Sequence, residues 1–158
     1  GQTNSKTVTN ITKRPAVRQA IKDNLTVFTK HIIRSGETPE SIAFDLYGDA
    51  ELHWIILLTN DIYDRYHQWP MNVNQFQAYV NEKYSDPFAT HHFEISQTSG
   101  DTTIKIDIGQ DDTDHSGATA VTNYQYEQDR QDILRQIKLV DPDNVNQFVS
   151  DFSRLMEE

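Results

Sequence analysis

The stretch that most constrains the fold is residues 35–61, SGETPESIAFDLYGDAELHWIILLTND, because it carries the start and stop signals of consecutive helices. The Thr38 side chain can accept a hydrogen bond from a free amide at a helix start, and Pro39 suits the first helical position. Gly48 readily adopts the left-handed conformation that commonly ends a helix. The side chains between these signals that share one face are Ile42, Ala43 and Leu46. The sequence therefore predicts a helix that begins at Pro39 and ends at Gly48.

A second helix is predicted directly after the first. Asp49 is placed to cap it, and residues 50–59 contain the apolar run LHWIILL. A helix that is apolar over most of its surface must be buried between its neighbours. We therefore expect this helix, and Trp54 within it, in the core.

The residues before this stretch predict an arm, a short helix and a strand. Residues 1–14 are polar and have no hydrophobic period, so we expect an extended or disordered arm that ends at Pro15. Apolar residues four apart predict a short amphipathic helix, and they are Val17, Ile21 and Leu25. The segment TVFTKHIIRSG then predicts a strand closed by a turn at Ser35 and Gly36.

The second half of the chain predicts a helix, a β-hairpin and a closing helix. Pro70 forces a break, after which Asn72 or Asn74 can cap a helix with a face of Val73, Phe76, Tyr79 or Val80, and Tyr84. Alternating apolar residues on either side of SGD predict a hairpin, and they are Phe93, Ile95, Ile104, Ile106 and Ile108. The segments AVTNYQYEQDR and DILRQIKLV fit either a strand or a helix, and Pro142 ends the second. Asp143 can cap a closing helix whose apolar residues are Val145, Phe148, Val149, Phe152 and Leu155.

Composition excludes several classes of function. The 158 residues carry a formal net charge of −10, which would repel a phosphate backbone and suits partners with basic patches. The chain has no cysteine, which excludes disulfides and thiolate metal sites. No apolar run approaches the roughly 18 residues of a membrane span, and the polar start lacks the apolar region of a signal peptide. We therefore expect a soluble, unexported protein that binds neither nucleic acid nor membrane.

Residues 31–60 resemble a LysM module, a βααβ fold that binds peptidoglycan or chitin. The residues that carry the resemblance are the strand HIIRSG, the turn Gly36-Glu37-Thr38, Ile42-Ala43, Tyr47-Gly48 and Asn60. They are scaffold residues, so the resemblance implies a fold before it implies a ligand. After the residue that matches Asn60, a LysM module returns through a short turn and a second strand, whereas this chain continues with DIYDRYHQWP.

The segment LYGDAELHWIILLTNDIYDRYHQWP resembles the baseplate wedge protein encoded by gene 53 of T-even-like contractile-tailed phages. The segment YEQDRQDILRQIKLVDPDNVNQFVSDFSRLMEE resembles the closing part of that family, so the resemblance covers roughly residues 30–158, and the arm before Pro15 matches nothing. It implies a structural subunit of the virion tail baseplate, assembled in the host cytoplasm. Such a subunit, present in several copies, contacts wedge proteins of its own and the adjacent wedge and promotes association of six wedges around the hub. The alternative function is that of a peptidoglycan-binding LysM module.

The candidate chemical sites are weak, and the candidate interface is stronger. Carboxylates such as Glu37, Glu40 and Glu51 are explained by surface solubility, so we expect no enzyme. Residues 112–117 match half of a calcium loop, but Asn123 stands where the bidentate Glu is needed. His91, His92 and Glu94 could ligate a metal, but His91 and His92 are adjacent in a strand and should point to opposite faces. Asp61, Asp64 and His67 lie in a segment that we expect to be a loop. We expect no metal and no cofactor.

The aromatic group Tyr63, Tyr66, His67 and Trp69 is predicted to be a protein interface.

Together these patterns predict an α+β protein in which a LysM-like βαα module is followed by a helix, a β-hairpin and a C-terminal helix. The predicted segments are an N-terminal arm and short helix (1–30), the LysM-like module (31–71), a connecting helix (72–86), the β-hairpin region (87–140) and the C-terminal helix (141–158).

Overall fold

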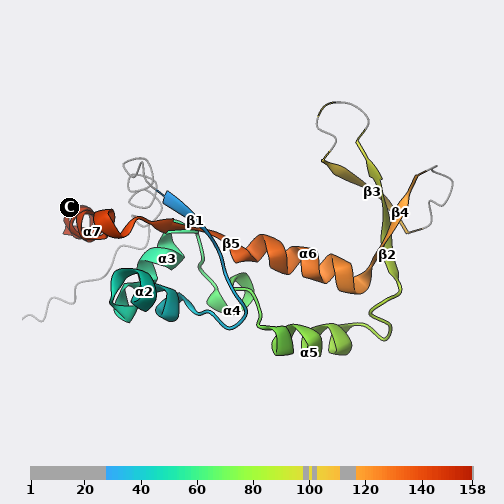
Figure 1. Ribbon diagram of the computed structural model, residues 1–158, viewed down its shortest axis with the longest axis horizontal. Coiled ribbons are helices and arrows are strands. Elements are labelled where there is room, and N and C mark those ends of the chain that lie inside the picture. The colour runs from blue at the N-terminus through green and yellow to red at the C-terminus, as the bar shows by residue number, and fades with distance from the viewer. Residues whose placement is uncertain (1–27, 98–99, 101–102, 111–116, 158) are drawn as a thin grey trace, which may run out of the picture. The chain divides into compact units, whose positions relative to one another are not determined.

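The computed structural model describes residues 28–97, 100, 103–110 and 117–157 (Figure 1). The described chain mixes helices and strands, which confirms the predicted α+β class. It forms two compact units: the first contains residues 28–32, 37–68 and 137–157, and the second contains residues 33–36 and 69–136. The predicted arm and its short helix lie outside the described residues. The LysM-like arrangement and the five-segment division stay predictions.

The first unit combines a two-stranded sheet with helices. Strand β1 (Phe28–Ile32) pairs with β5 (Gln136–Val140), although more than a hundred residues separate them in the chain. Between them in sequence come α2 (Pro39–Tyr47), the short 3-10 helix η2 (Ala50–Leu52), α3 (His53–Thr59) and the single helical turn α4 (Arg65–Gln68). A second 3-10 turn, η3 (Pro142–Asn144), and the helix α7 (Val145–Glu157) close the unit. The strand that completes the sheet therefore comes from the C-terminal part of the chain.

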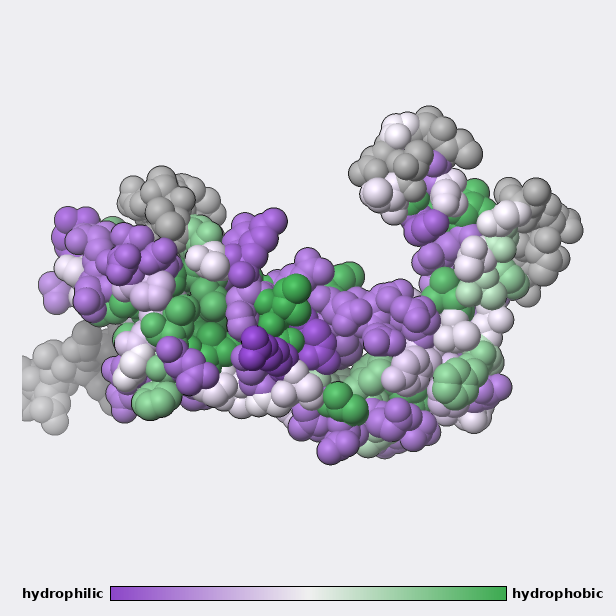
Figure 2. Space-filling model, viewed as in Figure 1, coloured by the Kyte–Doolittle hydropathy of each residue, from purple (hydrophilic) through white to green (hydrophobic). Residues whose placement is uncertain are grey.

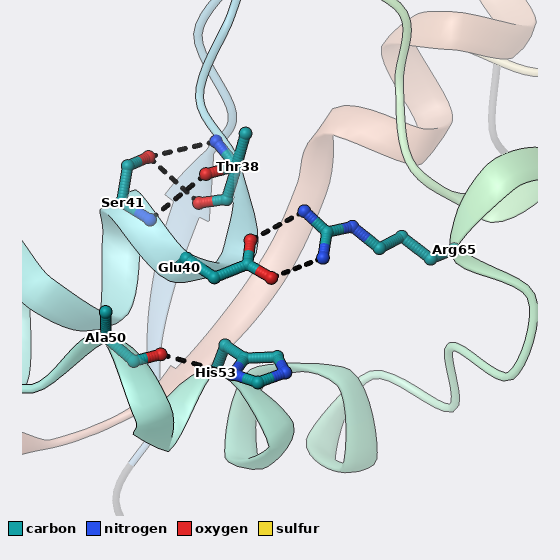
Figure 3. A network of polar contacts seen from close by, with 6 residues as sticks. All are labelled: Thr38, Glu40, Ser41, Ala50, His53 and Arg65. Carbon is teal, nitrogen blue, oxygen red and sulfur yellow. Dashed lines mark hydrogen bonds and ion pairs between the residues drawn. The ribbon is translucent and has the colours of Figure 1, made fainter.

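The predicted helix signals of the first unit are confirmed. The Thr38 side chain accepts a hydrogen bond from the Ser41 amide at 3.1 Å, and the Ser41 hydroxyl accepts one from the Thr38 amide at 2.9 Å (Figure 3). This reciprocal pair is a capping box, and it satisfies two amides at the helix start. Gly48 ends α2 at φ 74°, a conformation that a side chain would strain. Asp49 caps η2 by accepting from the Glu51 amide at 2.9 Å.

The core of the first unit lies between α3, β5 and α7. Its buried residues are Ile55, Val140, Val145 and Phe148. Trp54 packs against this core, with its ring centroid 5.9 Å from that of Phe148 and 4.8 Å from that of Phe152. The amphipathic pattern of the closing helix is thus confirmed, and Trp54 packs against the core but is itself only partly buried. The predicted cap Asp143 is wrong: Asp141 accepts from the Asp143 amide, because Pro142 begins a 3-10 turn before α7 starts.

Asn60 joins the end of α3 to β5. Its side-chain amide donates to the Ile56 and Lys138 carbonyls, both at 2.8 Å, and its side-chain oxygen accepts from the Lys138 amide at 2.8 Å. A single side chain therefore pairs with both backbone groups of one strand residue. Tyr47 also bonds to this strand, because its hydroxyl donates to the Val140 carbonyl at 2.8 Å, and burial raises the pKa of Tyr47 to about 12.

We expect Asn60→Ala to lower the free energy of unfolding by about 3 kcal/mol, because three hydrogen bonds are lost and each contributes on the order of 1 kcal/mol. Urea titration of the variant and the wild type would measure the difference. Asn81→Ala is the matched control, since Asn81 is exposed and its side chain accepts only a 3.3 Å bond from Gln77. Equal losses in the two variants would contradict the joining role of Asn60.

The second unit contains two helices and a three-stranded sheet. Helix α5 (Val73–Lys83) starts at Asn72, which forms a capping box with Gln75. The antiparallel sheet has the order β3 (Lys105–Gly109), β2 (Thr90–Ser96), β4 (Thr119–Thr122), and helix α6 (Asn123–Arg135) follows β4. The predicted helix and hairpin are confirmed. The segment left open between strand and helix contains both, since the chain changes from β4 to α6 at Asn123.

Helix α6 buries polar side chains four residues apart. Glu127 and Gln131 are buried, and Gln131 accepts a 2.8 Å bond from the Met71 amide. Arg135, one turn further on, donates to the Met71 carbonyl at 3.1 Å. In the view of Figure 2, hydrophilic residues also cover most of the visible surface of α6. Hydrogen bonds therefore take the place of much of the apolar packing at this helix.

Candidate protein interface

The aromatic segment that the sequence singles out begins where α3 ends. The Asp61 amide donates to the Leu58 carbonyl at 3.3 Å, and the Ile62 amide donates to the Leu57 carbonyl at 2.9 Å. These two bonds, with Asp61 in the left-handed region at φ 56°, form a Schellman motif. Glycine is usual at this position, and aspartate is one of the residues that tolerate it. The helix thus ends in a defined reversal.

Hydrogen bonds from backbone amides to the side chains of Gln68 and Asp64 fix the conformation of residues 61–68. The Gln68 side-chain oxygen accepts from the Tyr63 amide at 2.7 Å and from the Asp64 amide at 2.8 Å. Asp64 in turn accepts from the Tyr66 amide at 3.0 Å and from the His67 ring, and the hydrogen bond from His67 lowers the pKa of Asp64. The expected loop is therefore corrected: residues 65–68 form the helical turn α4, because Asp64 caps it. The segment has a fixed shape.

This fixed segment exposes aromatic side chains. Tyr66 is 88% exposed and Tyr63 is 72% exposed, and the Tyr66 and His67 ring centroids are 5.0 Å apart, edge to face. Trp69 is half-buried and belongs to the second unit. The structure therefore places three of the four predicted interface residues on one short segment of the first unit. Nothing in the structure tests their interface role, which stays a prediction.

Two further residues of this surface come from α2, and the sequence patterns missed them. The Arg65 guanidinium donates two hydrogen bonds to the Glu40 carboxylate, which hold α4 beside α2 and lower the pKa of Glu40 (Figure 3). Phe44 lies one helical turn after Glu40, on the same side of α2, and is 61% exposed. The sequence did contain one signal for this surface: Phe44 is an apolar residue that falls outside the predicted apolar face of Ile42, Ala43 and Leu46. We call the surface formed by these elements the α2–α4 face; it comprises Glu40, Phe44, Asp64, Arg65 and Tyr66.

The other candidate sites give no metal centre in the described part of the chain. A register shift between Thr90 and His92 brings the rings of His91 and His92 together, with their Nδ1 atoms 2.9 Å apart. The expectation that these rings point to opposite faces is wrong, because a bulge interrupts the alternation of the strand. Even so, no group of three His, Asp or Glu side chains there could hold a metal ion. Most of the predicted calcium loop lies outside the described residues.

No described helix has both the length and the apolar character that crossing a membrane requires.

The family of the chain follows from comparison with known proteins. A family model described as base plate wedge protein 53 matches residues 3–92, which is more than half of the chain. The chain belongs to the base plate wedge protein 53 family. Baseplate wedge protein gp53 of Enterobacteria phage T4 is 27% identical over 145 residues, covering 81% of this chain and 73% of that protein.

Membership of the base plate wedge protein 53 family confirms the resemblance seen in the sequence. It supports a structural role in a phage tail baseplate and contacts with other baseplate components. One expectation is corrected: the family match begins at residue 3, so the arm before Pro15 does belong to the matched region. Sequence patterns missed this because the arm has no hydrophobic period to compare.

Proposed function

We propose that this protein joins neighbouring wedge subunits and promotes assembly of the wedge ring around the baseplate hub, with the α2–α4 face as a contact surface. Tyr66 carries the proposal, because it is 88% exposed on a backbone fixed by Asp64 and Gln68. Tyrosine and arginine are enriched at binding hot spots, and a fixed backbone loses little entropy when a partner binds. Tyr63, His67 and Trp69 are proposed as contributors. Repetition around a ring would multiply modest contacts.

We expect Tyr66→Ala to weaken association with baseplate complexes by about tenfold or more while the protein stays folded. The aromatic ring makes no contact that the core needs, whereas a hot-spot residue lies at the centre of an interface. Co-sedimentation of the tagged full-length chain with tail-assembly complexes from an infected-cell lysate measures the effect. Phe88→Ala is the matched control, since Phe88 is a 73% exposed aromatic residue of the second unit. A folded Tyr66→Ala variant that sediments like the wild type would refute the role of this face.

Peptidoglycan binding is the second candidate function. The observation that favours it is the element order of the first unit, in which β1, α2 and α3 are followed by a strand that pairs with β1. Retention of the isolated chain on purified sacculi, with competition by soluble glycan fragments, would support it. Retention on tail-assembly complexes but not on sacculi would contradict peptidoglycan binding and support the wedge-joining role.

A further inference from the structure

The bulge in β2 brings two histidine rings into contact with each other. Thr90 and His92 pair with consecutive residues of β4, Thr122 and Val121, so His91 is the extra residue of the bulge. The Nδ1 atoms of His91 and His92 are 2.9 Å apart, and the ring centroids are 5.1 Å apart in an edge-to-face arrangement. We call these two residues, joined by a hydrogen bond between their imidazole rings, the histidine pair.

The two members of the histidine pair differ in their surroundings. His92 is 6% exposed, and its Nε2 atom lies 2.9 Å from a carboxylate oxygen of Glu94. His91 is half-buried and stacks on Tyr126 of α6, with the ring centroids 3.8 Å apart and the ring planes 11° apart. The Arg130 guanidinium lies 5.8 Å from the centre of the same Tyr126 ring. The histidine pair therefore links the three-stranded sheet to α6.

The charged groups around the histidine pair have opposite signs on its two sides. On the side of Glu94, β3 adds Asp107, which lies directly opposite Glu94 in the sheet register. On the other side, α6 contributes Arg130 and the Tyr126 phenol. The β4 residues opposite the bulge, Val121 and Thr122, carry no charge. A positive charge on His92 is thus favourably placed, whereas a positive charge on His91 would meet Arg130.

The hydrogen bond limits how many protons the histidine pair can hold. A carboxylate only accepts, so the His92 Nε2 atom carries a proton and donates it to Glu94. A hydrogen bond between two Nδ1 atoms contains one proton, so one atom donates and the other accepts. The closed pair can therefore be neutral or carry a single positive charge. Two positive charges would place a hydrogen on both Nδ1 atoms, and a 2.9 Å contact between two N–H groups must break.

We propose that the histidine pair is a pH-sensitive switch, which links the sheet to α6 when closed and releases this link when both rings are protonated. Histidine ordinarily gains its proton between pH 8 and pH 5. His91 is the ring that moves, because His92 keeps its hydrogen bond to Glu94 whereas a charged His91 is repelled by His92 and Arg130.

The direction of the pH effect follows from the proton count. The open state binds one more proton than the singly charged closed state, so a fall in pH favours opening. The equilibrium constant for opening should rise by up to about tenfold for each pH unit. The switch does not depend on the proposed wedge-joining role.

NMR of the isotope-labelled full-length chain tests the switch directly. At pH 8 we expect a coupling across the hydrogen bond between the two Nδ1 nuclei, and a nuclear Overhauser effect between the His91 and Tyr126 rings. Both should be lost at pH 5, where ordinary histidines are protonated. The Phe76 and Tyr124 rings, which are 5.4 Å apart in the same unit, provide the internal control, and their Overhauser effect should persist.

A variant that cannot take up the second proton should lose the pH response. His91→Asn places a neutral side-chain amide near the position of Nδ1. The backbone amide signals of Val121 and Thr122, which change between pH 8 and pH 5 when the bulge opens, should then lose most of that change. His53→Asn is the matched control, since His53 lies in the first unit, where its Nδ1 atom is 3.1 Å from the Ala50 carbonyl oxygen. It should leave the response of the second unit unchanged.

Three results would overturn the proposal. A His91 to Tyr126 Overhauser effect that persists at pH 5 would show that the contact does not open. Loss of the Phe76 to Tyr124 effect at the same pH would show that the unit unfolds as a whole. Absence of the Nδ1 coupling at pH 8 would show that the rings share no proton. None of these results bears on the wedge role, because the experiment contains no other baseplate protein.

Discussion

Replacing Phe148 with alanine is expected to lower the free energy of unfolding by about 3–5 kcal/mol, the range for truncating a buried phenylalanine. Phe148 is 2% exposed, lies in the cluster with Ile55, Val140 and Val145, and touches the Trp54 ring. Truncation leaves a cavity at the point where α7 meets α3 and β5, and close-packed neighbours fill such a cavity only in part. Urea denaturation followed by Trp fluorescence would measure the loss.

The same change at an exposed position provides the control. Phe44→Ala removes an identical side chain from the first unit, but Phe44 is 61% exposed, so we expect a loss below about 1 kcal/mol. A large difference between the two variants would locate the stability of this unit in the α3, β5 and α7 core. If both variants lost the same amount, that location would be wrong.

The sequence predicted the first unit well where local chemistry decides the structure. Thr38, Pro39 and Gly48 act within a few residues of their own position, so their effect on the backbone can be anticipated from the letters alone. The alternation that predicts the β2–β3 hairpin is equally local. These elements were found because each signal and the structure that it specifies share one short segment.

Long-range pairings could not be predicted in this way. Strand β5 pairs with β1 across more than a hundred residues, and the sequence of β5 gives no indication of its partner. Asn60 is visible as a helix-ending residue, but its bonds to Lys138 depend on where β5 lies in the folded chain. For the same reason the pairing of Glu40 with Arg65, which brings Phe44 into the candidate site, has no local signature.

The sequence pattern of α6 does not distinguish a helix from a strand, because this helix departs from the usual amphipathic rule. Its buried residues include Glu127 and Gln131, whereas Ile133 is 70% exposed. A search for an apolar stripe therefore finds a weak signal, since burial here is compensated by hydrogen bonds. The structure shows the compensation: the Tyr84 hydroxyl donates to the Glu127 carboxylate at 2.7 Å, and the Lys83 ammonium pairs with it.

Replacing Glu127 with alanine is expected to lower the free energy of unfolding by about 2–3 kcal/mol, because hydrogen bonds to a charged group are lost and their donors stay behind. Glu127 is 3% exposed, whereas the Lys83 side chain is 40% exposed and can be rehydrated after the change. We therefore expect a smaller loss than the about 3–5 kcal/mol typical of breaking a fully buried ion pair. Glu82→Ala, a change at an exposed position of α5, is the control and should have little effect on the urea midpoint.

The pH dependence separates the charge of Glu127 from its packing. Burial raises the pKa of Glu127, but the hydrogen bonds from Lys83 and Tyr84 lower it, and the net direction is below the ordinary carboxyl value of 4.5. A carboxyl whose pKa is lower in the folded state contributes stability above its unfolded pKa and loses it as the pH falls through the folded value. Glu127→Gln keeps the shape and removes the charge. Its deficit in unfolding free energy relative to the wild type should be full at pH 7 and should shrink below about pH 4. A deficit that is the same at pH 7 and pH 3 would show that packing, and not the carboxylate charge, makes Glu127 important to the second unit.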